Sequence, residues 1–104
     1  MNSPLPRRLK YIRKKQGMTQ RELGDKLGMD QAGASARISQ YETGKHAPDY
    51  ATVKRMSEVL NTPVAYFYCE DDVLAHIVIG VSNHNLFAKL DILNFIESYR
   101  VNTP

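Results

Sequence analysis

The sequence predicts an all-α fold, and three observations support that prediction. Apolar residues recur every three or four positions in most segments, which is the spacing of one face of an α-helix. Glycine or proline separates these segments, at positions that include Gly17, Gly28, Gly44 and Pro63. The chain has 104 residues, of which 42% are apolar and 24% charged, which is enough for one globular domain.

The first expected helix covers residues 5–16. Leu5, Leu9 and Ile12 lie on one side of a helical wheel, and basic residues cover the opposite arc of about 160°. These basic residues are Arg7, Arg8, Lys10, Lys14 and Lys15, and Arg13 lies on the border between the two sides. Gly17 suits the left-handed conformation that follows many helices.

The next two expected helices are short. The segment TQRE at 19–22 has the form of a capping box, so a helix should run from residue 20 to about 27. The third helix is expected over 35–43, with Ile38 and Tyr41 in the core and Gly44 after its end.

Two further helices should complete this part of the chain. Asp49 is the expected N-cap of a helix over about 50–60. Asn61 then suits the residue after that helix, Thr62 the N-cap of the next, and Pro63 its first position. This fifth helix should cover about 63–69.

One or two helices are expected after residue 70. The β-branched run HIVIGV within 73–81 allows either a strand or a helix. We favour a helix, because the apolar residues of the segment would then share a face of about 140°. The segment 85–99 is helical in length and propensity, and apolar residues surround most of it.

Charge is unevenly distributed along the chain. Residues 1–46 carry ten Lys or Arg and four acids, whereas residues 47–104 carry four bases and seven acids. This imbalance favours a polyanion-facing surface in the first half, with Arg8 among the residues that contact it.

Other patterns exclude several classes of protein. The single cysteine, Cys69, cannot form an internal disulfide, and no apolar run has the length of a membrane span, so a cytoplasmic protein is expected. Cysteine, histidine and acidic residues show no metal-ligand spacing. We therefore expect neither an enzyme nor a metal or other cofactor.

Three segments carry a family resemblance: TQRELGDKLG at 19–28, ARISQYETGKHAPD at 36–49 and VKRMSEVLN at 53–61. Together they resemble the helix-turn-helix domain of the phage-repressor and Cro-like (Xre-type) transcriptional regulators. The resemblance implies a five-helix lambda-repressor-like bundle over residues 1–70 that binds double-stranded DNA in a sequence-specific manner. It implies that the helix over 35–43 enters the major groove. A repressor is the expected role.

The same resemblance assigns roles to individual residues. It implies that Arg13 and Glu42 form a structural ion pair. The residues expected to contact DNA through this resemblance are Gln20, Ser35, Ala36, Arg37, Ser39, Gln40, Thr43 and Lys45.

The chain departs from the family pattern between Gly28 and Ile38, where it is about four residues longer. Either the turn before the recognition helix is extended, or that helix begins earlier, near Asp30.

The segment 71–104 is expected to be a dimerisation extension. A helix that is apolar nearly all round needs cover on more than one side, and a second copy is the simplest cover. Two alternatives are that its leucines fold back on Phe67 and Tyr68 in a monomer, or that it binds a different protein, as in an antitoxin or adaptor. The expected interface residues are Val73, Ile77, Leu86, Leu90, Leu93 and Ile96.

Overall fold

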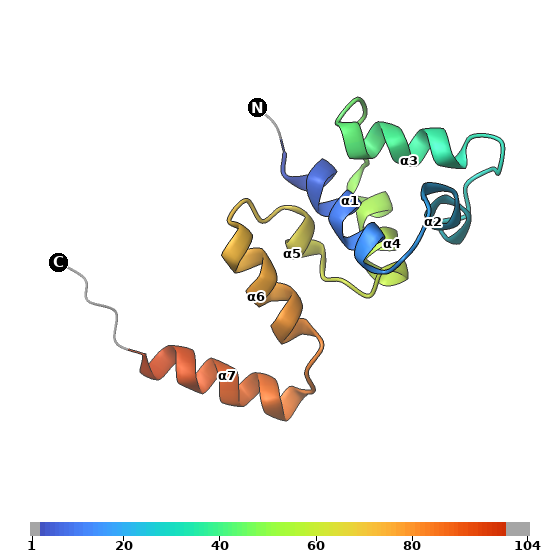
Figure 1. Ribbon diagram of the computed structural model, residues 1–104. Coiled ribbons are helices and arrows are strands. Elements are labelled where there is room, and N and C mark those ends of the chain that lie inside the picture. The colour runs from blue at the N-terminus through green and yellow to red at the C-terminus, as the bar shows by residue number, and fades with distance from the viewer. Residues whose placement is uncertain (1–2, 100–104) are drawn as a thin grey trace.

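The computed structural model describes residues 3–99, which contain seven α-helices (Figure 1). The first five helices form a bundle, and the last two form an extension. The expected domain ends at residues 1–2 and 100–104 lie outside the described residues. The helices of the bundle are α1 (Leu5–Lys15), α2 (Gln20–Lys26), α3 (Ala34–Thr43), α4 (Tyr50–Val59) and α5 (Val64–Phe67). The helices of the extension are α6 (Asp72–Ser82) and α7 (Leu86–Ser98).

Side-chain caps set the start of α2 and α4, as the sequence predicts. The Thr19 hydroxyl accepts a hydrogen bond from the Glu22 backbone N–H at 3.0 Å, and the Glu22 carboxylate accepts one from the Thr19 N–H at 2.8 Å. The hydrogen bond from the Thr19 N–H lowers the pKa of Glu22. At α4, the Asp49 carboxylate accepts from the Thr52 N–H at 2.8 Å, and hydrogen bonding to Thr52 lowers the pKa of Asp49.

The start of α5 differs from the prediction. Pro63 occupies the N-cap position and has an extended backbone, whereas Thr62 was expected there. The Thr62 hydroxyl instead donates to the Leu60 carbonyl at 2.9 Å. Asn61 has the predicted left-handed conformation, with φ of 48°.

The core lies between the five helices of the bundle. Each helix contributes fully buried apolar side chains at helical spacing, so one face of each is removed from water. The apolar residues with no exposed surface are Leu9, Leu23, Ala34, Ile38, Val53, Met56, Leu60 and Phe67.

The segment after residue 70 is helical, which confirms the helix that was favoured over a strand for residues 73–81. The Asp71 carboxylate accepts from the Leu74 N–H at 3.0 Å and caps α6, and the Asn85 side chain accepts from the Ala88 N–H at 2.9 Å and caps α7. These caps satisfy backbone donors that a helix start leaves free, which favours helix despite the β-branched residues. No helix within residues 3–99 has both the length and the apolar character of a membrane span.

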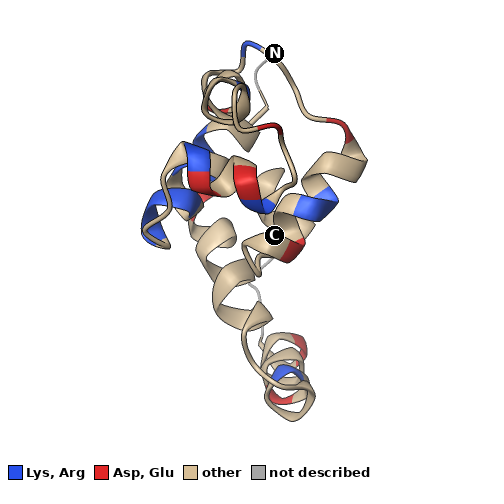
Figure 2. Ribbon diagram, turned by 90° about the vertical axis from the view of Figure 1, so that its right-hand side faces the viewer, with Lys and Arg blue, Asp and Glu red and all other residues tan. Residues whose placement is uncertain are grey.

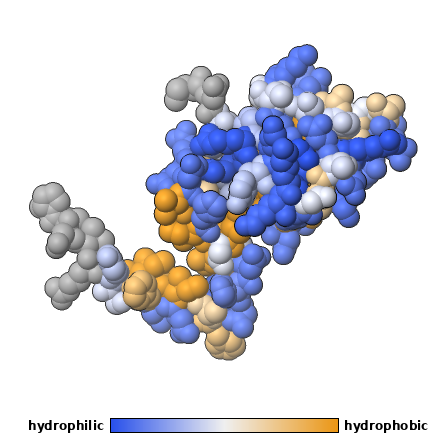
Figure 3. Space-filling model, viewed as in Figure 1, coloured by the Kyte–Doolittle hydropathy of each residue, from blue (hydrophilic) through white to orange (hydrophobic). Residues whose placement is uncertain are grey.

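The extension leaves most of its apolar surface exposed. Among the residues of α6 only Ala75 is buried, and α7 has no buried residue. Figure 3 shows apolar side chains on both helices, on either side of a hollow between them. The expected alternative in which Leu86, Leu90 and Leu93 fold back onto Phe67 and Tyr68 is not what the structure has, because these leucines are exposed.

Candidate nucleic-acid interface

Helix α3 has one buried side and one polar, accessible side. Ala34, Ile38, Tyr41 and Glu42 are buried, and on a helical wheel they occupy an arc of about 100°. The opposite arc of about 140° carries exposed or half-buried residues, namely Ser35, Ala36, Ser39, Gln40 and Thr43. Arg37 is exposed and lies about 60° beyond this arc. Five of the predicted DNA-contacting residues therefore share one accessible face.

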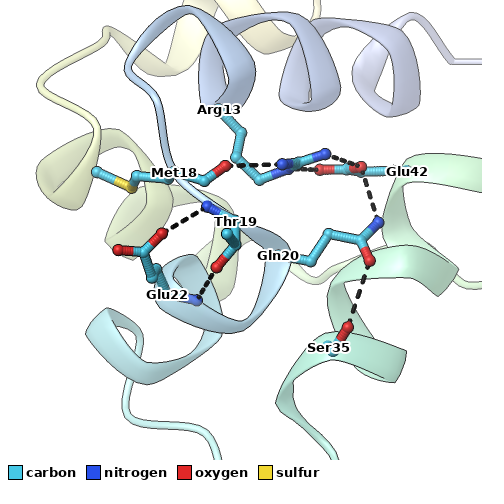
Figure 4. Close-up of polar contacts among 7 residues, drawn as sticks. All are labelled: Arg13, Met18, Thr19, Gln20, Glu22, Ser35 and Glu42. Carbon is cyan, nitrogen blue, oxygen red and sulfur yellow. Dashed lines mark hydrogen bonds and ion pairs between the residues drawn. The ribbon is translucent and has the colours of Figure 1, made fainter.

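A buried ion pair joins α1 to the end of α3 (Figure 4). Arg13 donates from Nε to Glu42 Oε2 at 2.5 Å and from Nη2 to Oε1 at 3.0 Å, and both side chains are more than nine-tenths buried. Arg13 Nη1 also donates to the Met18 carbonyl at 2.8 Å. This two-point contact is the pairing that the sequence predicts, and its planar geometry restrains the orientation of α3.

Gln20 lies inside this network rather than free at the surface. Its amide donates to Glu42 Oε1 at 3.2 Å, and its carbonyl accepts from the Ser35 hydroxyl at 3.4 Å (Figure 4). Gln20 is half-buried at the first position of α2. It therefore links the starts of α2 and α3 to the Arg13–Glu42 pair.

Helices α2 and α3 approach each other closely at Gly24. A Cβ atom on Gly24 would lie 2.6 Å from the Ala34 Cβ and 3.1 Å from its Cα, which is closer than atoms can pack. Neither residue was among those singled out from the sequence. The signal was available, because glycine in the middle of a short helix lowers helix propensity and calls for a packing reason.

The connection between these two helices is an extended turn. α2 ends at Lys26 and α3 begins at Ala34, so the alternative in which the recognition helix begins near Asp30 is wrong. The Gly33 N–H donates to the Asp30 carbonyl at 3.0 Å, and Arg21 donates to the Gln31 side chain at 3.2 Å. The additional residues thus form a turn before the N-terminus of α3 that these two hydrogen bonds stabilise.

The loop after α3 keeps the predicted geometry. Gly44 has φ of 80°, a left-handed conformation that favours glycine, and ends the helix. Thr43 and Lys45 are exposed on either side of it. The Lys45 ammonium is therefore accessible next to the polar face of α3.

Arg8 does not lie free on the surface, which corrects its assignment as a DNA-contacting residue. It is 7% exposed and donates to the Cys69 carbonyl at 2.9 Å, the Glu70 carbonyl at 3.2 Å and the Asp72 carboxylate at 2.7 Å. The hydrogen bond and charge of Arg8 lower the pKa of Asp72. Arg8 therefore joins α1 to the start of α6.

Charged residues are concentrated in the bundle (Figure 2). α6 carries no Lys, Arg, Asp or Glu after Asp72, and α7 carries only Lys89, Asp91 and Glu97. The basic residues of α1 other than Arg8 and Arg13 are exposed. The bundle is thus the part of the chain whose surface suits a polyanion.

Comparison with known proteins agrees with this fold. The helix-turn-helix family model matches residues 9–67, which is more than half of the chain. The chain therefore belongs to the helix-turn-helix family of DNA-binding transcriptional regulators of the Xre/Cro-like type. This family consists of regulators rather than enzymes, in agreement with the sequence prediction.

Two individual proteins are similar to this chain. The crystal structure of the transcriptional regulator BswR matches with a TM-score of 0.88 and 40% identity, over 91% of this chain and 94% of that chain. The uncharacterized HTH-type transcriptional regulator YqaE of Bacillus subtilis (strain 168) is 36% identical over 58 residues, which is 56% of this chain. The match covers 47% of YqaE, so the chain spans about half the length of that curated relative.

Proposed function

We propose that this protein is a repressor that binds a near-palindromic operator as a homodimer, with α3 of each copy in the major groove. The observation that carries the proposal is the polar face of α3, held at its base by the buried Arg13–Glu42 pair. A major groove about 12 Å wide admits one α-helix, so a rigid helix with one polar face suits direct contact with base edges. Occupancy of the operator would block transcription.

The residues divide into two groups by the part of DNA they suit. Gln40 and Ser39 lie on the polar face of α3, and an amide such as that of Gln40 can bond N6 and N7 of adenine together. Lys45 and the backbone around Gly44 suit phosphate, which positions the protein without selecting a sequence. Ser35, Ala36, Thr43 and Gln20 border the same surface, and Arg37 lies at its edge.

Salt dependence tests the DNA-binding part of this proposal. If five to seven phosphates are neutralised per DNA-bound unit, the logarithm of the binding constant should fall against the logarithm of salt concentration with a slope of about −5 to −6. The measurement is fluorescence anisotropy with a duplex selected from random or genomic DNA. Affinity that does not change between low and physiological salt contradicts the proposal.

Two matched substitutions separate base contact from phosphate contact. Gln40→Ala should change the preferred base at one operator position, by about 1–3 kcal/mol. Lys45→Ala should weaken binding to all sequences alike and reduce the salt slope by about one. If Gln40→Ala leaves the ranking of operator variants unchanged, Gln40 contacts no base.

The proposed dimer is supported by the exposed apolar surface of α6 and α7. The candidate interface residues on α6, Val73 and Ile77, are 70% and 50% exposed. Those on α7, namely Leu86, Leu90, Leu93 and Ile96, are also exposed. Apolar surface of this extent marks an interaction site. A twofold dimer predicts half-sites separated by one helical turn, about 34 Å, or a multiple of it.

A second candidate function follows from the same surface. The extension could bind a different protein, as an antitoxin-like or adaptor protein does, with DNA binding in a supporting role. Purification of the full chain from its native cells separates the two. A second polypeptide at a fixed ratio favours the adaptor, and a homodimer alone favours the repressor.

A further inference from the structure

Three leucines on α7 form a stripe that is exposed in the described part of the chain. Leu86, Leu90 and Leu93 are 66%, 45% and 47% exposed. On a helical wheel they fall within about 60° of one another. The half-buried residues of α7, Ala88 and Ile92, lie about 130–170° from the middle of the stripe. The stripe is therefore a separate surface from the side of α7 that packs within the chain.

The spacing of this stripe is that of a coiled-coil seam. Four residues separate Leu86 from Leu90, three separate Leu90 from Leu93, and Glu97 follows four residues later. This is the alternation of core positions in a heptad repeat, and such a seam packs against a helix with the same spacing. α7 of a second copy has that spacing, so the seam is complementary to itself.

Glu97 determines how two copies of the seam can be oriented. In a parallel symmetric pair each residue faces its own copy, so Glu97 would meet the partner's Glu97 at a core position. Two like charges that face each other destabilise a helix pair. The chain thus disfavours the parallel arrangement.

The antiparallel arrangement removes this conflict. With Leu90 opposite the partner's Leu93, Glu97 lies at the end of the seam beside the partner's Leu86. The partner's Lys89 is then within one helical turn of Glu97, where opposite charges attract. Each flank of the seam also carries an apolar side chain, Ile96 on one side and Phe87 on the other; they are 56% and 78% exposed and would be covered in the pair.

We propose that α7 pairs antiparallel with α7 of a second copy, through the leucine stripe and a Lys89–Glu97 ion pair at each end. This inference rests on the proposed function, because it names the surface that forms the DNA-binding dimer. A second copy is the partner, since Lys89 and Glu97 next to the leucine stripe complement each other under a twofold rotation.

Charge reversal in the full chain tests the arrangement. Lys89→Glu and Glu97→Lys should each raise the dimer dissociation constant about fivefold, because two ion pairs are lost per dimer. The double variant should return to within about twofold of the wild-type value, since the pairs re-form with exchanged signs. Sedimentation equilibrium measures these constants.

Asp91→Lys is the matched control, because it makes the same charge change as Glu97→Lys but on the polar side of α7. It should leave the dimer dissociation constant unchanged. A double variant that is no tighter than the weaker single variant overturns the antiparallel pairing. If that chain still dimerises and binds a palindromic duplex, the proposed function stands without this seam. A wild-type chain that remains monomeric at micromolar concentration overturns both the seam and the dimeric part of the proposed function.

Disulfide trapping gives a second, independent measurement. In a Cys69→Ser background, a Leu90→Cys chain is mixed with a Leu93→Cys chain of different length. Antiparallel pairing predicts that the mixed disulfide exceeds either self-disulfide. Predominant self-disulfides indicate parallel pairing and overturn the proposal.

Discussion

The bundle and the extension obtain their structure in different ways. In the bundle, five short helices share one core, and most of their apolar side chains are inaccessible to water. In the extension, two helices have side-chain caps at their starts, yet Ala75 is the one buried residue that they contribute among residues 3–99. The bundle is therefore stabilised by its own core. The extension forms capped helices, but its apolar side chains have no core to pack in. That difference separates the helix-turn-helix bundle from the segment that we propose as the surface for a second copy.

The largest expected difference in stability between the two regions is the one between substitutions of Phe67 in the bundle and Phe95 in the extension. Phe67 is 0% exposed and Phe95 is 66% exposed. Phe67→Ala should lower the free energy of unfolding by about 3–5 kcal/mol, because it leaves a cavity in a close-packed core. Phe95→Ala should change it by less than about 0.5 kcal/mol in the monomer. Urea denaturation at a concentration that keeps the chain monomeric checks both, and equal losses would remove the distinction between the regions.

A second comparison concerns two basic residues of α1. Arg13→Ala leaves the Glu42 carboxylate buried without its partner and should destabilise the bundle by about 3 kcal/mol. Lys14→Ala removes an exposed charge and should have an effect below about 0.5 kcal/mol. Thermal denaturation of both variants measures the difference. Similar melting temperatures would mean that the ion pair contributes little to the bundle.

The junction between the two regions should depend on pH. Arg8 lowers the pKa of Asp72 below its value in the unfolded chain, so this contact contributes stability above about pH 4. The contribution is lost as the pH falls through the lowered pKa and the carboxyl takes up a proton. Asp72→Asn should therefore lower the melting temperature slightly at pH 7 and have no effect near pH 2. Asp91→Asn on α7 is the control, and a difference that persists at pH 2 would exclude a charge-based contact.

The smallest expected effect is at Tyr66, where the bundle meets the extension. Its hydroxyl is buried and has no hydrogen-bond partner among residues 3–99, and burial raises the pKa of the phenol. Tyr66→Phe removes a hydroxyl whose burial without a hydrogen-bond partner costs free energy. The melting temperature should therefore stay the same or rise slightly. Calorimetry provides the measurement. A marked loss of stability would show that the hydroxyl has a partner in solution.

Local signals predicted the fold well because they act within a few residues. The Thr19 and Glu22 capping box, the Asp49 cap and the glycines after the helices are all encoded in short stretches of sequence. The helix over 72–82 could be favoured over a strand on the spacing of its apolar residues. Its cap, Asp71, stands between Glu70 and Asp72, and acidic residues of this kind favour the start of a helix.

Long-range contacts explain what the sequence could not predict. Arg8 was grouped with the basic arc of α1, yet its partners lie 61 to 64 residues away along the chain. A helical wheel contains a partial signal, since Arg8 and Arg13 occupy the two borders of the arc and both are buried. The DNA contacts of Gln40, Ser39 and Lys45 stay predictions, because their partner is DNA.

The contact between Gly24 and Ala34 has a consequence for how such regulators diverge. Both residues lie on the inner side of the helix pair, and a larger side chain at Gly24 would force α2 and α3 apart. The outer face of α3 contributes nothing to this contact. Substitutions on that face can therefore accumulate without loss of the fold, while these two small residues stay under strong constraint. Descendants of one ancestral regulator can in this way acquire different target sites on an unchanged scaffold.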